Sequence, residues 1–129
     1  LIKTAHDISD GGITIALAEA SMTSGLGAKC NFSFCDNRID KVLFGEGGSR
    51  VIISVASDKL DSFMNFVEKI NNNFLEPVAI TSIGIVNKLE TLEINIDDKQ
   101  IINLSINQIA STYEQAIQNR IESSILEND

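Results

Sequence analysis

Basic residues, histidine and long apolar runs are all scarce in this sequence of 129 residues. Ten lysines and arginines stand against 18 acidic residues, which gives a formal net charge of −8. Because affinity for nucleic acids comes largely from basic side chains at the phosphate backbone, this balance argues against a nucleic-acid-binding protein. A single histidine excludes a two-histidine metal site. No apolar run reaches the roughly 18 residues that indicate a membrane-spanning helix.

The two cysteines, Cys30 and Cys35, are five positions apart. In a strand, an odd separation places them on opposite faces, too far apart for a disulfide, and their spacing does not suggest zinc. We therefore expect two buried or half-buried thiols in a reducing compartment. The first residues lack the apolar segment of a signal peptide, which favours a cytoplasmic protein. Because Leu1 is not an initiator methionine, we also expect a piece of a longer protein.

What the chain does contain is typical of one globular domain. Its hydrophobic fraction is 43% and its charged fraction 22%, close to the globular average. We therefore expect a single domain over residues 1–129. The charge is uneven: residues 1–50 hold five basic and six acidic side chains, whereas residues 51–129 hold five and twelve. The first part is nearly neutral.

Hydrophobic periodicity predicts three main helices. The first covers residues 12–24, where apolar residues recur at i, i+3, i+4 and i+7, and Gly25 follows as a C-cap. The second lies within residues 57–73, with Ser57 and Asp58 as capping residues. The third runs to about residue 124 and is opened by a capping-box pair, Ser105 and Gln108. We expect its apolar residues to face inward: Ile106, Ile109, Ala110, Tyr113, Ile117 and Ile121.

Five strands and one further short helix complete the prediction. Turn residues and β-branched runs place the strands at 28–35, 50–56, 78–86, 91–96 and 100–104, and the short helix at 37–43. Gly84 is expected to mark a bulge or a close-packing point. This order of elements predicts an α/β fold of the α+β type, with a layered mixed β-sheet and flanking helices.

The first group of candidate binding residues stands where a loop enters the helix over 12–24. Glycines allow close approach of the backbone to a ligand, and the free amides at a helix start favour phosphate. Two carboxylates there suit Mg²⁺ held against phosphate oxygens. The alternative is purely structural, with an aspartate N-cap, a turn serine and a hydrogen-bonded histidine. The candidate residues are His6, Asp7, Ser9, Asp10, Gly11 and Gly12.

The second group is a glycine-rich loop that leads directly into the strand over 50–56. Successive backbone amides in such a loop can form an anion nest, and a serine and an arginine can add donors. The alternative is a tight turn that feeds the strand, with the arginine in a structural ion pair. The candidate residues are Gly45, Glu46, Gly47, Gly48, Ser49 and Arg50.

Four segments occur in one order, and together they resemble a known family. They are residues 6–12, the helix over 12–24 together with residues 25–28, residues 43–51, and residues 83–86. The series resembles the C-terminal domain of the phosphoribosylformylglycinamidine synthases, in the aminoimidazole ribonucleotide synthetase (PurM-like) superfamily. The resemblance implies an ATP- and glutamine-dependent ligase of purine biosynthesis, which converts formylglycinamide ribonucleotide to the corresponding amidine.

The resemblance also implies roles for individual residues. Asp7 is expected to bind Mg²⁺, and Ser9 with the amides of Gly11 and Gly12 to face the phosphates of ATP or ADP. Residues 45–50 are expected to form the second loop of that cleft. The implied partners are an upstream ATP-binding domain of the same chain and a glutaminase subunit or domain. No catalytic residue is expected in this piece, so the isolated chain should be inactive.

Two alternatives remain open. One is an architectural or interaction domain that keeps this fold and binds no ligand. The other is a domain of a different ATP-dependent synthetase or kinase of the same superfamily.

Overall fold

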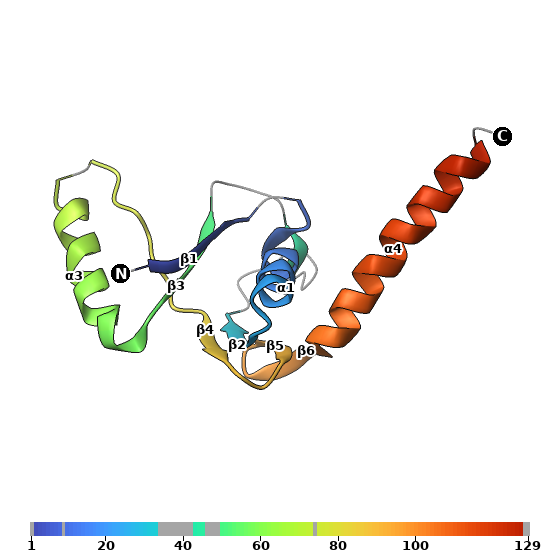
Figure 1. Cartoon of the computed structure of the whole chain (residues 1–129). Coiled ribbons are helices and arrows are strands. Elements are labelled where there is room, and N and C mark those ends of the chain that lie inside the picture. Colours follow the sequence, from blue (N-terminus) through green and yellow to red (C-terminus); the bar gives the residue numbers. More distant parts are fainter. Residues whose placement is uncertain (1, 9, 34–42, 46–49, 74, 128–129) are drawn as a thin grey trace. The chain divides into compact units, whose positions relative to one another are not determined.

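The computed structural model describes residues 2–8, 10–33, 43–45, 50–73 and 75–127 (Figure 1). The chain forms two compact units, which are described separately. Unit 1 comprises Leu1–Ala16 and Asp36–Ile83, and unit 2 comprises Leu17–Cys35 and Gly84–Asp129. The boundary falls inside helix α1 (Gly12–Ser24), whose first turn therefore belongs to unit 1 and whose later turns belong to unit 2.

Unit 1 is built on a two-stranded antiparallel sheet. Strand β1 (Ile2–Asp7) pairs with β3 (Val51–Val55), with Asp7 opposite Val51. The sequence predicts β3 but not β1. Strand β1 escapes prediction because nearly all its residues are exposed, so it lacks the alternation of apolar and polar positions that marks a half-buried strand.

Helix α3 (Leu60–Asn71) follows a 3-10 turn, η1 (Ser57–Lys59). The predicted helix is thus confirmed, but the capping role of Ser57 and Asp58 is wrong. Both residues lie in the 3-10 turn, and no side chain caps either element. Phe63 is the buried residue of α3.

The strand predicted over residues 78–86 forms only at its end, as β4 (Gly84–Asn87). The side chain of Asn71 occupies both backbone groups of Val78: its Oδ1 accepts from the Val78 N–H at 2.9 Å, and its Nδ2 donates to the Val78 C=O at 3.0 Å. These bonds replace the ladder bonds that a strand would need there.

Unit 2 contains a four-stranded mixed sheet in the order β4-β2-β5-β6. Strand β2 (Gly27–Phe32) runs parallel to β5 (Thr91–Ile96), whereas β4 pairs antiparallel to β2 and β6 (Lys99–Ser105) antiparallel to β5. The predicted α/β class with a mixed sheet is confirmed, although the strands among the described residues form two sheets. Every second residue of β5 is buried, and the core of unit 2 contains Leu17, Ala28, Cys30, Leu92, Ile94 and Ile96.

Two predicted backbone features of unit 2 are confirmed. The hairpin between β5 and β6 turns at Asp97 and Asp98, which have φ of 48° and 67°. The side chain of Asn31 holds this turn, because its Nδ2 donates to Asp98 Oδ1 at 3.0 Å. Gly84 is a close-packing point: a Cβ there would lie 2.7 Å from the Cα of Cys30.

Helix α4 (Ile106–Glu127) begins with the predicted capping box. The Ser105 N–H donates to Gln108 Oε1 at 2.9 Å, and the Gln108 N–H donates to Ser105 Oγ at 3.1 Å. The prediction that its apolar residues all face inward is wrong. Only the first turn is half-buried, and Tyr113, Ile117 and Ile121 are exposed. Figure 1 shows why: α4 leaves β6 and runs away from the four-stranded sheet.

No helix among the described residues has both the length and the apolar content that crossing a membrane requires.

Candidate anion-binding site at the start of helix α1

The two glycine motifs approach each other at one end of the β1–β3 sheet. Asp7 is the last paired residue of β1, and one residue further the Ile8 N–H donates to the Arg50 C=O at 3.0 Å. The segment that leaves β1 leads into α1, and the segment that enters β3 comes from Gly45. Antiparallel pairing therefore brings both motifs to the same edge of unit 1.

Direct contact between the motifs occurs at Gly12. A Cβ at Gly12 would lie 2.6 Å from the carbonyl carbon of Phe44 and 2.9 Å from the oxygen of Gly45. Its φ of +75° is a second reason for glycine, because side chains other than glycine rarely adopt it. Gly11, with φ of +84°, is similarly restricted, since a Cβ there would lie 2.9 Å from the Cβ of Ile15. The backbone of residues 44–45 thus packs directly on the first residue of α1.

The start of α1 offers backbone hydrogen-bond donors. No described side chain accepts a hydrogen bond from the backbone N–H of Gly12, Ile13 or Thr14. The first amides of a helix have no partner within the helix, and the helix dipole places partial positive charge there. This end of α1 is therefore suited chemically to an anion such as a phosphate.

Thr14 adds a polar group that the sequence does not single out. Its side chain is 6% exposed, and its Oγ1 has no hydrogen-bond partner among the described residues. A buried hydroxyl without a partner is costly, and such groups are unusual in folded proteins. In the sequence, Thr14 looks like an ordinary helix residue between Ile13 and Ile15. Its buried hydroxyl becomes evident only from the structure, in which this face of α1 is buried.

The predicted metal ligand, Asp7, lies at the exposed end of β1, and Asp10 is exposed just before Gly11. No group of three potential metal ligands occurs among the residues that the structure describes. Mg²⁺ commonly takes one or two protein carboxylates and completes its shell with waters and phosphate oxygens. The exposed carboxylates of Asp7 and Asp10 are therefore of the kind that suits Mg²⁺ shared with a phosphate ligand.

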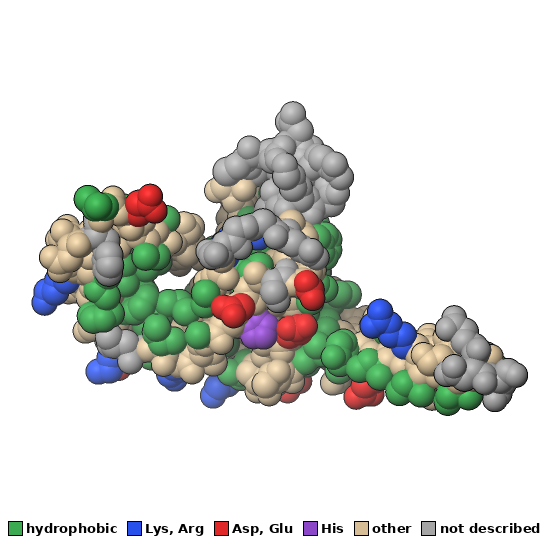
Figure 2. All heavy atoms as spheres, turned by 90° about the horizontal axis from the view of Figure 1, so that it is seen from above, with side chains coloured by type: hydrophobic (Ala, Val, Ile, Leu, Met, Phe, Trp, Pro, Cys, Tyr) green, Lys and Arg blue, Asp and Glu red, His purple; other side chains and the backbone are tan. Residues whose placement is uncertain are grey.

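The remaining residues of the first motif are His6 and Ser9. His6 is half-buried on β1, opposite Ile52. Figure 2 shows the chain's one histidine, in purple, reaching the surface on a face that also carries acidic side chains, in red. Ser9 lies outside the described residues.

In the second motif, the described side-chain hydrogen bond of Arg50 goes to a backbone carbonyl. Its Nη2 donates to the carbonyl oxygen of Gly45 at 2.9 Å. The sequence favours a phosphate or a glutamate as the partner of Arg50. Glu46, Gly47, Gly48 and Ser49, which complete the predicted loop, lie outside the described residues.

Cys30 contributes no reactive group. It is 4% exposed in the core of unit 2, and burial raises the pKa of its thiol from 9.0 to about 11. A thiol that stays protonated at neutral pH is a poor nucleophile. The burial of Cys30 confirms the prediction of a buried thiol at this position. Cys35 lies outside the described residues.

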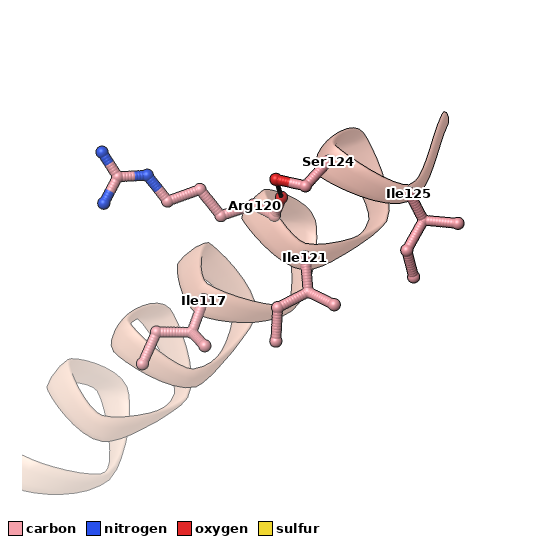
Figure 3. Close-up of a pocket in the computed structure, with 5 residues that line it drawn as sticks. All are labelled: Ile117, Arg120, Ile121, Ser124 and Ile125. Carbon is pink, nitrogen blue, oxygen red and sulfur yellow. Dashed lines mark hydrogen bonds between the residues drawn. The ribbon is translucent and has the colours of Figure 1, made fainter. Parts of the chain in front are cut away.

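A shallow depression lies on α4, and Figure 3 shows that one helix forms it alone. Ile117, Ile121 and Ile125 point to one side, and Arg120 points away from them. The Oγ of Ser124 is already bonded to the carbonyl oxygen of Arg120 at 3.0 Å. Because no polar groups converge there, it has none of the features of a small-molecule site.

Similarity to known proteins agrees with the fold and with the two motifs. The chain is 44% identical over 126 residues to the phosphoribosylformylglycinamidine synthase subunit PurL of Prochlorococcus marinus strain SARG, covering 98% of this chain and 16% of that protein. It is 40% identical over 117 residues to the PurL subunit of strain MIT 9301, covering 91% of this chain and 15% of the relative. The chain thus spans about a sixth of the length of these curated relatives.

Solved structures of low sequence identity share the fold. A structure described as Thermotoga maritima PurL complexed with ATP matches with a TM-score of 0.68 and 16% identity, over 85% of this chain and 19% of that one. A structure of PurLQS from the same organism matches with a TM-score of 0.65 and 14% identity, over 85% and 19%.

The family described as AIR synthase related protein, C-terminal domain, matches residues 1–88. This range contains β1, the whole of α1, β2, β3 and both glycine motifs. The chain therefore belongs to this family of AIR synthase related C-terminal domains.

Proposed function

We propose that residues 1–129 form a C-terminal domain of a phosphoribosylformylglycinamidine synthase, in which the start of α1 binds nucleotide phosphate. The contact of Gly12 with residues 44–45 carries this proposal, because it joins both glycine motifs at a helix start whose amides no described side chain caps. The names of the curated relatives support the assignment to this synthase.

The complete enzyme would be an ATP-dependent carbon–nitrogen ligase. It would convert formylglycinamide ribonucleotide to formylglycinamidine ribonucleotide, with ammonia that comes from glutamine. In phosphoryl transfer, catalysis rests mainly on positioning and on neutralisation of the phosphate charge. The amides at the start of α1 supply both to a bound phosphate without any basic side chain, which is how an acidic chain can hold an anion.

The proposed ligands are ATP or ADP together with Mg²⁺. Bound Mg²⁺ would neutralise phosphate oxygens, and Asp7, with Asp10 nearby in the sequence, supplies carboxylates of the kind it prefers. The amides of Gly12, Ile13 and Thr14 are the donors for phosphate. PurL structures described as complexes with ATP and with ADP support nucleotide binding in the relatives.

Most of the active site would lie outside this chain. We propose that an upstream ATP-binding domain of the same polypeptide completes the nucleotide site, and that a glutaminase subunit or domain supplies ammonia. The chain spans about a sixth of its curated relatives, which supports further domains in the same polypeptide. The solved PurLQS structure supports further subunits in a relative. The isolated chain should accordingly show no ligase activity, and the whole enzyme is expected to be cytoplasmic.

A segment exchange tests the proposed function. The matching segment of PurL from P. marinus strain SARG is replaced by this chain, and the ligase activity of the purified chimera is measured with its glutaminase. We expect activity above roughly one-tenth of that of a control chimera that carries the segment from strain MIT 9301. A folded chimera with no activity beside an active control contradicts the proposal.

The same chimera tests the metal site. Replacing Asp7 by Asn should lower the amount of nucleotide that co-purifies and should reduce the melting temperature, because bound ligand stabilises the folded state. Glu19→Gln, which removes a carboxylate on the exposed side of α1, is the matched control. Unchanged nucleotide content in Asp7→Asn would count against the role of Asp7.

A further inference from the structure

The guanidinium of Arg50, in the second motif, bonds to a backbone carbonyl. It reaches back along the chain to the oxygen of Gly45. The bond joins Gly45 to the residue that directly precedes β3, and it therefore restricts where Gly45 can lie relative to the start of that strand.

The oxygen that Arg50 holds is the same atom that packs on Gly12. A Cβ on Gly12 would lie 2.9 Å from the Gly45 oxygen, so this carbonyl is close to the first residue of α1 and is also bonded to the guanidinium of Arg50. The backbone of Arg50 is fixed independently, because its carbonyl accepts from the Ile8 N–H at 3.0 Å. Arg50 is thus anchored to the segment before α1 through its backbone and to the segment that packs on α1 through its side chain.

We propose that Arg50 is a positioning residue, which holds residues 44–45 against Gly12 and thereby fixes the entry to α1 for phosphate binding. This role, which we call the latch, rests on the proposed function. It differs from direct phosphate binding, in which the charge of Arg50 would meet the ligand. A planar guanidinium suits the latch because its several donors have fixed directions, whereas lysine offers a mobile point charge.

The two roles predict different results for Arg50→Lys and Arg50→Ala. The 129-residue chain, labelled with ¹⁵N, is titrated with inorganic phosphate and followed by NMR. If Arg50 is a latch, the amide signals of Gly12 and Gly45 shift in both variants before any phosphate is added. Both variants should then bind phosphate more weakly, by about three- to tenfold, which corresponds to the net contribution of roughly one ordinary hydrogen bond.

Direct binding gives the opposite pattern. In that case Arg50→Lys keeps most of the affinity, and the Gly12 signal of the phosphate-free chain is the same as in the wild type. Retained phosphate affinity in Arg50→Lys, or an unchanged Gly12 signal in the phosphate-free variants, would each contradict the latch role of Arg50. Arg120→Lys and Arg120→Ala, which make the same changes in unit 2, are the matched controls and should leave the Gly12 and Gly45 signals in place.

Failure of the latch is distinguishable from failure of the proposed function. If the wild-type chain shows no phosphate-dependent shift at Gly12, Ile13 or Thr14, the proposed function and the part of Arg50 in it are both overturned. If the wild type binds phosphate but the Arg50 variants leave the phosphate-free spectrum unchanged, only the latch is overturned. Unchanged signals of Leu92 and Ile94 show that unit 2 has kept its fold in each variant.

Discussion

Helices α1 and α4 both show apolar periodicity in the sequence, but only α4 has backbone amides at its start that described side chains cap. Helix α4 begins with a complete capping box, so two amides at its start are satisfied by side chains. Helix α1 follows Gly11 and begins with Gly12, both at positive φ, and no described side chain accepts from the amides of residues 12–14. Yet α1 is buried on one face, whereas most of α4 is exposed.

The two helix starts are stabilised in different ways: that of α4 by local hydrogen bonds and that of α1 by tertiary packing. A capping box stabilises a helix end by itself, so α4 can extend beyond the sheet that it follows. The start of α1 depends instead on the packing of Gly12 against residues 44–45. An end that is held in place by packing keeps its amides available for a ligand, and this is the property that the proposed phosphate site requires.

Substitutions in the buried core should destabilise the protein far more than substitutions on the exposed face of α4. Ile94 is 0% exposed and Ile121 is 56% exposed. Ile94→Ala should lower the free energy of unfolding by about 2–5 kcal/mol, because it removes buried methyl groups and leaves a cavity. Ile121→Ala should change it by less than about 0.5 kcal/mol. Chemical denaturation measures both, and an equal loss in the two variants would show that α4 is packed in the same way as the core.

The next effect concerns the glycines at the two ends of α1. Gly12→Ala should cost about 3 kcal/mol, because it combines a positive φ with a backbone clash. Gly25→Ala is the matched control: its φ is +71°, but nothing lies within 4 Å of an added Cβ. It should cost only about 1 kcal/mol, which is the conformational contribution alone. Thermal unfolding of both variants gives the difference, and similar melting temperatures would contradict the contact of Gly12 with residue 44.

A pH effect of intermediate size is expected from Cys30. Burial raises the pKa of its thiol from 9.0 to about 11, so between these values the unfolded chain loses a proton that the folded chain keeps. Stability from this group is therefore complete below pH 9 and falls as the pH rises toward 11, by roughly 2 kcal/mol in all. The decline between pH 9 and pH 11 should be smaller in Cys30→Ala, measured by urea denaturation. Identical slopes would indicate that the thiol is not buried in unit 2.

The smallest effect tests the cap of α4. Ser105→Ala removes the Oγ that accepts from the Gln108 N–H, at a cost of about 1 kcal/mol to the helix. Amide hydrogen exchange should accelerate in the first turn of α4 and stay unchanged in α1. Asn107→Ala, in the same turn and outside the capping box, serves as the control. Faster exchange in both variants would mean that the cap does not secure this end.

Much of the fold follows from local sequence signals. The helix over residues 12–24, the hairpin at Asp97 and Asp98, and the capping box at Ser105 are all predicted correctly, because each depends on residues close together in the sequence. The wrong predictions concern segments whose structure depends on contacts between residues that are farther apart in the sequence. Strand β1 forms only because β3 pairs with it, and the side chain of Asn71 withdraws Val78 from a strand.

For the candidate site, the sequence indicates both glycine motifs but not their contact. The meeting of Gly12 with residues 44–45, the buried hydroxyl of Thr14 and the bond from Arg50 to Gly45 each depend on tertiary packing or on the burial of one helix face. No local pattern carries that information. The roles of Ser9 and of residues 46–49 stay predictions.

We propose that the start of α1 is open to phosphate and that the start of α4, whose amides are capped, is not. The most direct test is an NMR titration of the ¹⁵N-labelled chain with inorganic phosphate and with MgADP, against chloride at the same ionic strength. We expect saturable shifts of the Gly12, Ile13 and Thr14 amides and none at Gln108, whose amide is capped. Equal shifts at both helix starts, or no saturable shift at α1, would contradict the claim.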